Sequence, residues 1–272
     1  MIKLIFLRGR TCRTFRRFIH RETVKAFSPK IREGIIFEQT TPIVFLSGEG
    51  LSLNIWDGCA DLLAARGYSG LKMQLPANMS NVDEMVDSIN NEFVKNKITP
   101  PIMITHSFST LIGQRYLESY GLKGLVMINP LPPKPINALN RLYKNCNIIR
   151  SEHGLELYLN TYYTKLFSAK ELELFQSNFS HDDSTIIAIR KMIIENNFSI
   201  VIEPKSTDIL VIYSRADAYL TDDEKSSLII THGLQPDLNI FTIDDGSRCP
   251  FFCEQKLKEI DNILDPWLDT VF

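Results

Sequence analysis

Short apolar runs alternate with amphipathic segments along most of the chain. Runs that are bounded by glycine, proline or polar turn residues predict buried strands. These runs are 42–46, 70–75, 101–105, 125–128, 208–213 and 238–243. Segments whose apolar residues recur every three or four positions predict helices between the strands. These segments are 54–67, a segment that Ser80 can cap, 110–120, 222–231 and 250–267.

The regular alternation of strand and helix predicts one fold class. Successive strands that are joined by helices form a mostly parallel sheet, and the helices cover both of its faces. The alternation is interrupted over residues 136–203, where the pattern favours several helices and no strand. We therefore predict an α/β core formed by 40–132 and 205–272, with a helical cap insertion at 133–204.

The first 28 residues differ from the rest in charge. They contain a single acid, Glu22, among these bases: Lys3, Arg8, Arg10, Arg13, Arg16, Arg17, Arg21 and Lys25. An arginine-rich, acid-poor and amphipathic segment is typical of a mitochondrial transit peptide. We expect 1–28 to be a removable targeting segment and the protein to be in the mitochondrial matrix, with the cytoplasm as the alternative. A basic tail that binds membrane or nucleic acid is the other interpretation of the segment.

Composition narrows the classes of function. The 272 residues are 44% hydrophobic and 23% charged, with a net charge of -2. These values are typical of a globular protein and do not indicate a nucleic-acid partner. No apolar run is long enough to predict a membrane span. The five cysteines are irregularly spaced, so we expect neither a disulfide framework nor a metal site. No glycine-rich phosphate loop follows a strand, so no cofactor is predicted.

The segment around Ser107 is the main candidate for chemistry. The predicted strand 101–105 passes through a tight turn directly into the predicted helix 110–120. Such a turn lifts a serine hydroxyl above the sheet and places the next backbone N–H groups at a helix N-terminus, where they can hold an oxyanion. Small residues are needed two positions before and two positions after the serine, and this chain has Thr105 and Ser109 there.

The order of elements and several short motifs resemble the capped α/β-hydrolase family over residues 40 to 268. Leu46-Ser47-Gly48 is similar to the family's oxyanion loop, and Ser214-Arg215-Ala216-Asp217 is similar to the turn that carries the triad acid. Gly246-Ser247-Arg248-Cys249-Pro250 resembles the loop of the catalytic histidine. The resemblance implies that Ser107 is the nucleophile and Asp217 the acid. It also implies an oxyanion hole formed by the backbone of Phe108 and Glu49.

The chain departs from the family at the base. Arg248 occupies the position where the family has its histidine, and an arginine cannot take a proton from serine. Three groups are candidate surrogate bases. His153 and His181 belong to the predicted cap, and Glu49 follows the oxyanion loop.

Two functions remain open at this point. The first is a serine hydrolase, of the esterase type, that acts on an ester, thioester or amide of a small apolar substrate. The second is a catalytically inactive protein of the same fold that binds a ligand or acts as a scaffold, with Arg248 paired to Asp217. Aromatic residues of the cap either line an apolar pocket or form the core of the cap itself. They are Tyr162, Tyr163, Phe167, Phe175 and Phe179.

Overall fold

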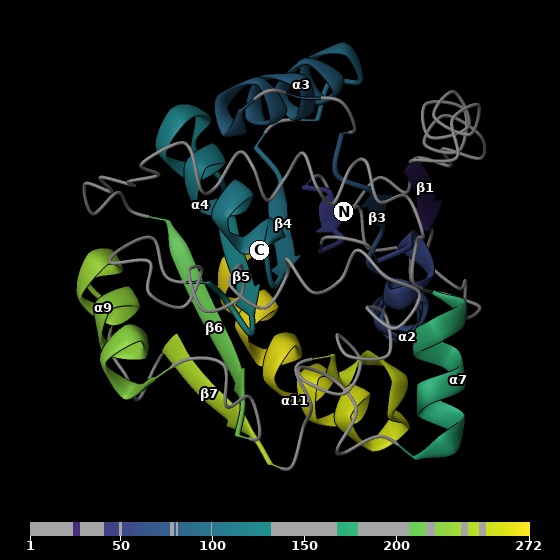
Figure 1. Ribbon diagram of the computed structural model, residues 1–272. Coiled ribbons are helices and arrows are strands. Elements are labelled where there is room, and N and C mark those ends of the chain that lie inside the picture. Colours follow the sequence, from purple (N-terminus) through teal and green to yellow (C-terminus); the bar gives the residue numbers. More distant parts are fainter. Residues whose placement is uncertain are drawn as a thin grey trace, which may run out of the picture.

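The computed structural model describes residues 24–27, 41–48, 51–76, 79, 81–98, 100–131, 168–178, 207–215, 221–234, 239–244 and 249–272. These residues form a seven-stranded sheet with helices on both of its faces (Figure 1). The strands lie in the order β1-β3-β2-β4-β5-β6-β7. Their bounds are β1 Val24–Phe27, β2 Ile43–Leu46, β3 Gly70–Met73, β4 Ile102–His106, β5 Gly124–Ile128, β6 Asp208–Ser214 and β7 Ile240–Ile243.

The sheet is parallel except at one edge. Strand β1 pairs antiparallel with β3, and every other neighbouring pair is parallel. Strand β4 lies between β2 and β5, with Leu46 opposite Thr105 and Ile128 opposite His106. The carboxyl ends of these three strands therefore meet at one point of the sheet, which is where ligands bind in open parallel sheets. The predicted fold class is confirmed.

The helices divide between the two faces. One face is covered by α3 (Val82–Lys95), α4 (Ser109–Tyr120) and α9 (Asp222–His232). The other is covered by the 3₁₀ turns η2 (Leu53–Trp56) and η4 (Pro250–Phe252), and by the helices α2 (Asp57–Ala65), α7 (Ala169–Ser177) and α11 (Glu254–Val271). Of the predicted cap 133–204, the structure describes 168–178, which contain α7.

The two hydrophobic clusters follow the alternation of side chains along the strands. In β4, Met103 belongs to the cluster under α3 and α4, whereas Ile102 and Ile104 belong to the cluster under α2 and α11. All three side chains are fully buried. Burial of each stabilises the fold by about 1.5–3 kcal/mol relative to an exposed position.

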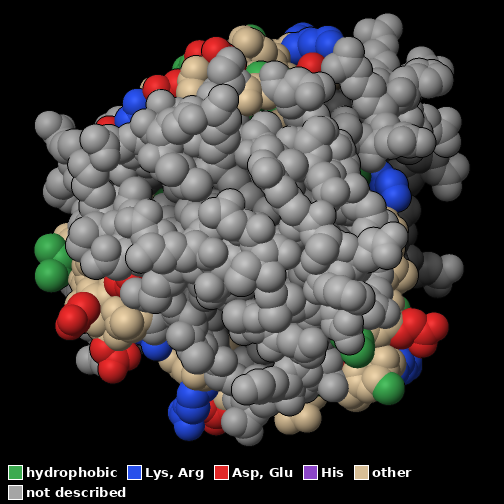
Figure 2. Space-filling model, in the orientation of Figure 1, with side chains coloured by type: hydrophobic (Ala, Val, Ile, Leu, Met, Phe, Trp, Pro, Cys, Tyr) green, Lys and Arg blue, Asp and Glu red, His purple; other side chains and the backbone are tan. Residues whose placement is uncertain are grey.

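Local residues explain where the helices begin and end. Asn81 caps α3, because its Oδ1 accepts from the Glu84 N–H at 2.8 Å. Ser80, the cap expected from the sequence, lies one position earlier in the chain. Helix α9 begins with a capping box between Thr221 and Glu224, and it ends at Gly233 with φ 60°. Acidic side chains gather over α9 on the face shown in Figure 2, in keeping with a solvated outer surface.

Strand β1 lies within the predicted N-terminal segment 1–28. Val24–Phe27 pair with β3, and the ring of Phe27 lies 5.6 Å from that of Phe45. The last part of the predicted segment 1–28 therefore includes four residues that belong to the sheet. A targeting role for the residues before Val24 stays a prediction. Within the described residues, no helix combines the length and apolarity that crossing a membrane would need.

Candidate active site

The turn between β4 and α4 holds Ser107 in an uncommon backbone conformation. Strand β4 ends at His106 and α4 begins at Ser109, so Ser107 and Phe108 alone form the turn. Ser107 has φ 54°, in the left-handed region that favours glycine. Holding a serine there costs on the order of 1–3 kcal/mol, and such strain concentrates at functional sites. Ser107 is 4% exposed.

Neighbouring backbone and side-chain groups hold this strained turn in place. The Ser107 N–H donates to the carbonyl of Ile128 at 3.1 Å, which ties the turn to the end of β5. The Ser107 carbonyl accepts from the Thr110 N–H at 3.1 Å and from Thr110 Oγ1 at 2.5 Å. Thr110 Oγ1 also accepts from the Leu131 N–H at 3.0 Å. The loop after β5 therefore stabilises the turn through one hydroxyl.

Ser109 stands between two strands. The Ile102 N–H of β4 donates to the carbonyl of Pro42, just before β2, and Leu46 lies opposite Thr105 at the other end of this ladder. There the His106 N–H donates to Ser109 Oγ at 2.9 Å, and Ser109 Oγ donates to the Leu46 carbonyl at 2.8 Å. The fully buried hydroxyl thus bridges β2 and β4 where the turn begins.

Thr105 is accommodated by a glycine in the facing helix. Its Oγ1 donates to the Val126 carbonyl at 2.8 Å. Its Cγ2 would lie 2.9 Å from a Cβ at Gly113, so any side chain at 113 would clash with it. A glycine within a helix costs about 1 kcal/mol relative to alanine. The missing side chain of Gly113 therefore gives room for a larger residue at 105.

Two backbone segments that can hold an oxyanion lie next to each other. Phe108 stands at the N-terminus of α4, where the first N–H groups have no acceptor within the helix. The loop after β2 approaches the same turn, since a Cβ at Gly48 would lie 3.1 Å from the His106 carbonyl. Ser47 holds this loop through its N–H, which donates to Met73 at 3.0 Å. Glu49 lies outside the described residues.

The ring of His106 is packed on the α2–α11 side of the sheet. It makes edge contacts with Phe251 and Trp56, with ring centroids 4.9 Å and 6.5 Å away. Its Nε2 lies 3.9 Å from Cys249 Sγ, and both residues are buried. This contact brings the segment after β7 next to the turn of Ser107. Cys249 directly follows Arg248, which itself lies outside the described residues.

His232 of α9 is buried on the opposite face. Its Nε2 lies 2.8 Å from Gln114 Oε1, and Gln114 Nε2 donates to the carbonyls of Thr110 and Leu131. Burial lowers the pKa of His232 to about 4, so the ring is neutral near pH 7. A neutral ring donates from Nε2 to the Gln114 oxygen. His232 therefore supports the helix of the turn through Gln114.

The ends of β5 and β6 are tied by a residue that sequence reasoning missed. Asn129 has φ 45° and exchanges two hydrogen bonds with Ser214, from Nδ2 to Oγ at 2.9 Å and from the Ser214 N–H to Oδ1 at 2.6 Å. Asparagine tolerates the left-handed region better than most residues, and an Asn-Pro pair after a strand is a turn signal. That signal could have identified Asn129.

The predicted site residues divide between described and undescribed parts of the chain. Ser107 and Phe108 are described and lie together at the turn. Asp217, Glu49, Arg248, His153 and His181 all lie outside the described residues. The strand ends that precede Asp217 and Arg248 in the chain are joined. The Arg215 N–H, after β6, donates to the carbonyl of Ile243, the last residue of β7, at 3.0 Å. Asp217 follows two positions after Arg215 in the sequence.

Phe175 settles one point about the aromatic residues of the cap. Its side chain is fully buried, and its ring packs edge-on against that of Phe252 at 5.8 Å. Phe175 is therefore a packing residue between α7 and η4. Tyr162, Tyr163, Phe167 and Phe179 lie outside the described residues. Among the residues that the structure describes, no group of His, Cys, Asp and Glu is placed to hold a metal ion.

Comparison with known proteins finds similarity at the level of structure. No protein-family model matches the chain, and a search of curated proteins finds no similar sequence. An esterase from Thermogutta terrifontis is similar over 91% of this chain and 93% of its own, with a TM-score of 0.71 and 14% identity. A hydrolase from Oleispira antarctica covers 91% and 95% of the two chains, with a TM-score of 0.72 and 13% identity. The enol-lactonase from Burkholderia xenovorans is similar over 90% of this chain and 96% of its own, with a TM-score of 0.67 and 14% identity.

Proposed function

We propose that this chain, which has the α/β-hydrolase fold, is a serine hydrolase of the esterase type, with Ser107 as its nucleophile. One observation carries the proposal: a buried serine held at φ 54° where the central strand β4 enters a helix. Unfavourable backbone geometry persists only where surrounding structure enforces it. Here Ile128, Thr110 and Ser109 enforce it by hydrogen bonds. The similar solved structures, an esterase and a lactonase among them, support the same class of reaction.

In this proposal Ser107 Oγ attacks the carbonyl carbon of an ester, thioester or amide of a small apolar molecule. The carbonyl oxygen becomes negative and is held by backbone N–H groups of Phe108 and of the loop that follows Gly48. The N-terminus of α4 adds a partial positive charge near the same place. Removing one donor from such a hole typically lowers kcat by about 10²–10³-fold.

The proton of Ser107 needs an acceptor. Arg248 cannot serve, and the two described histidines are engaged by Cys249 and Gln114. The proposal therefore assigns the proton to Glu49, His153 or His181, with Asp217 as the acid of the site. Because a general base contributes about 10²–10⁴-fold, we expect slow turnover unless one of these groups is well placed.

A second function is favoured by one specific observation. Cys249 contacts His106 and so lies beside the turn of Ser107. The residue before Cys249 in the chain is Arg248, where a histidine is expected. An arginine next to Asp217 would form a charge-assisted pair and fill the site. The chain would then be an inactive binding or scaffold protein with the same fold.

Hydrolysis of p-nitrophenyl esters with short and medium acyl chains separates the two functions. The serine hydrolase predicts turnover above the background rate, which Ser107→Ala removes and Ser226→Ala leaves unchanged. Ser226 is a suitable control because it is exposed on α9, where its hydroxyl donates to the Asp222 carbonyl. Equal rates for the wild type and Ser107→Ala would overturn the enzyme and favour the binding protein.

The location of the protein remains a separate proposal. The arginine-rich composition before Val24 supports import into mitochondria. A fluorescent fusion to residues 1–40 should enter mitochondria, and the same fusion with the arginines of that segment changed to glutamine should stay in the cytosol. Cytosolic location of the unchanged fusion would contradict the proposal.

A further inference from the structure

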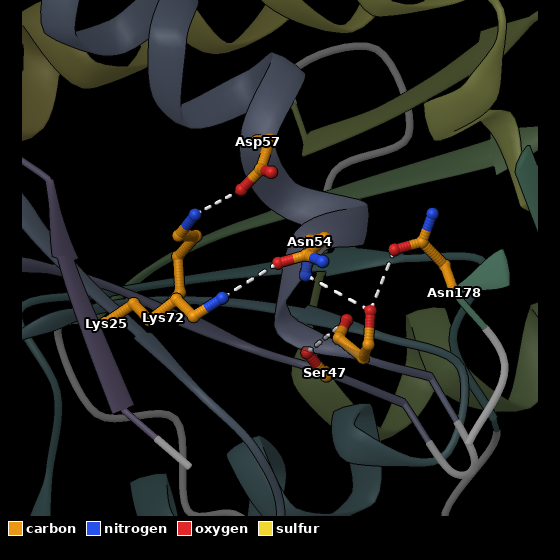
Figure 3. Close-up of polar contacts among 7 residues, drawn as sticks. Lys25, Ser47, Asn54, Asp57, Lys72 and Asn178 are labelled. Carbon is orange, nitrogen blue, oxygen red and sulfur yellow. Dashed lines mark hydrogen bonds and ion pairs between the residues drawn. The ribbon is translucent and has the colours of Figure 1, made fainter. Parts of the chain in front are cut away.

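The C-terminal end of α7 makes a two-point contact with Ser52, just after the loop that follows β2. The Ser52 N–H donates to the Asn178 carbonyl at 2.8 Å, and Ser52 Oγ donates to Asn178 Oδ1 at 2.8 Å. Asn178, labelled in Figure 3, makes this side-chain contact from a different part of the chain. The two residues are 126 positions apart in the sequence.

Ser52 is in turn connected to the loop itself. The Ser47 hydroxyl (Ser47 is labelled in Figure 3) donates to the Ser52 carbonyl at 3.4 Å, and the Leu51 N–H donates to the Gly48 carbonyl at 3.4 Å. Ser52 Oγ also accepts from the Asn54 N–H at 3.3 Å, which begins η2. These contacts tie the described residues on the two sides of this loop, 47–48 and 51–52, to each other, and Asn178 fixes them at Ser52. The near end of the loop, Gly48, lies against the His106 carbonyl.

Asn178 is oriented so that its oxygen faces Ser52. Its Nδ2 donates to the Leu174 carbonyl at 2.8 Å, and its backbone N–H donates to the same carbonyl at 3.2 Å. With both nitrogens turned to the helix end, Oδ1 is left to accept from Ser52. Phe175, buried against Phe252, anchors the last turn of α7. The contact thus joins two rigid elements.

We infer that Asn178 is a positioning residue of the reaction: through Ser52 it keeps Ser47 and Gly48 in place beside the turn of Ser107. The effect on catalysis rests on the proposed hydrolase function, whereas the effect on the loop does not. Asn178 acts on the loop and has no contact with the reacting atoms. A shift of about 1 Å in a positioned group can cost on the order of 10²-fold in rate, so loss of one hydrogen bond at the end of the loop has a measurable effect.

The test compares Asn178→Ala with two matched variants in the full-length protein. Asn178→Asp keeps an oxygen for Ser52. Ser177→Ala removes a neighbouring hydroxyl that donates to the same Leu174 carbonyl and accepts from Asn178 Nδ2 at 3.5 Å, and it leaves the Asn178 oxygen that faces Ser52 in place. With p-nitrophenyl butyrate, Asn178→Ala should lower kcat by about 10-fold with KM changed by less than about 2-fold, because the loop acts on the transition state. Asn178→Asp should recover most of kcat, and Ser177→Ala should match the wild type.

A second readout does not depend on activity. Amide hydrogen exchange of a peptide that covers 47–52 should become faster in Asn178→Ala and stay unchanged in Ser177→Ala, since local opening follows the loss of the fixed end. Unchanged exchange, or equal kcat in Asn178→Ala and the wild type, overturns the inference. If the wild type hydrolyses no ester while exchange responds as expected, the hydrolase proposal fails and the part of the inference that concerns the loop stands.

Discussion

The imidazole of His106 and the thiol of Cys249 lie in contact, with Nε2 3.9 Å from Sγ, although 143 positions separate the two residues. His106 directly precedes Ser107, and Cys249 directly follows Arg248. The contact therefore places Cys249 next to the turn after β4. The resemblance to the α/β-hydrolases predicts that Arg248, at the position of the family's histidine, faces the same turn.

Restoring a histidine is the direct test of that alignment. Arg248→His should install a base beside Ser107 and raise hydrolysis of p-nitrophenyl butyrate by about 10²-fold, within the usual range of general-base catalysis. Arg215→His is the matched control, because Arg215 is exposed and pairs with Asp244 on the neighbouring loop. A flat rate in Arg248→His would mean that position 248 does not face the nucleophile.

Ser109 should contribute to stability through its bridging hydroxyl. Ser109→Ala removes the buried hydroxyl that accepts from the His106 N–H and donates to the Leu46 carbonyl, so the free energy of unfolding should fall by about 1–3 kcal/mol. Urea unfolding measures the change, and Ser226→Ala on the surface of α9 should stay within about 0.5 kcal/mol of the wild type. Equal midpoints for Ser109→Ala and Ser226→Ala would show that a direct bond from His106 to Leu46 replaces the hydroxyl.

His232 should make the protein less stable in acid. Its pKa in the folded state is about 4, below the ordinary value of 6.5, so the unfolded chain binds the proton first as the pH falls. The stabilisation that the neutral His232 gives to the folded state is complete above about pH 6.5 and is lost progressively as the pH falls to about 4. The loss is on the order of 3 kcal/mol.

The substitution His232→Gln isolates this effect. Glutamine can still donate to Gln114 but does not titrate, so the difference in unfolding free energy between the two proteins should vary with pH between about 6.5 and 4. Denaturant titrations at several pH values measure that difference. Parallel curves for the two proteins over this range would contradict the assignment.

Strand β1 sets the limit of what can be removed from the N-terminus. Deleting residues 1–23 should leave the free energy of unfolding nearly unchanged. Deleting 1–28 removes the partner of β3 and the contact of Phe27 with Phe45, and should cost about 2 kcal/mol or more. Thermal and urea unfolding of the two truncated proteins make the comparison, and equal stability would show that β1 contributes nothing to the sheet.

The alternation of apolar runs with amphipathic segments was sufficient to predict the parallel strands and the order of strands and helices along the chain. Runs such as Ile102–Thr105 are buried on both faces, so the pattern is continuous and easy to recognise. Strand β1 was missed because it is a short edge strand. Its Lys25 reaches out to Asn54 at 3.0 Å (Figure 3), and the basic composition around it favoured a targeting segment.

The turn of Ser107 was predictable as a location, but the groups that hold it were not. A strand followed at once by a helix identifies the turn from the sequence alone. The supporting contacts join positions that are distant in the chain, such as Ser109 to Leu46, Gln114 to His232 and Ser52 to Asn178. Each is a hydrogen bond of a common polar residue and leaves no periodic pattern that sequence reasoning could detect.

Covalent labelling of Ser107 separates an active hydrolase from an inactive protein of the same fold. A fluorophosphonate probe reacts with a serine whose hydroxyl is activated and whose oxyanion hole is formed, so it reports the nucleophile without knowledge of the natural substrate. The account predicts that the full-length protein gains one probe, that peptide mapping places it on Ser107, and that Ser107→Ala gains none while Ser226→Ala labels like the wild type. Absence of labelling at high probe concentration, or labelling that persists in Ser107→Ala, would contradict it.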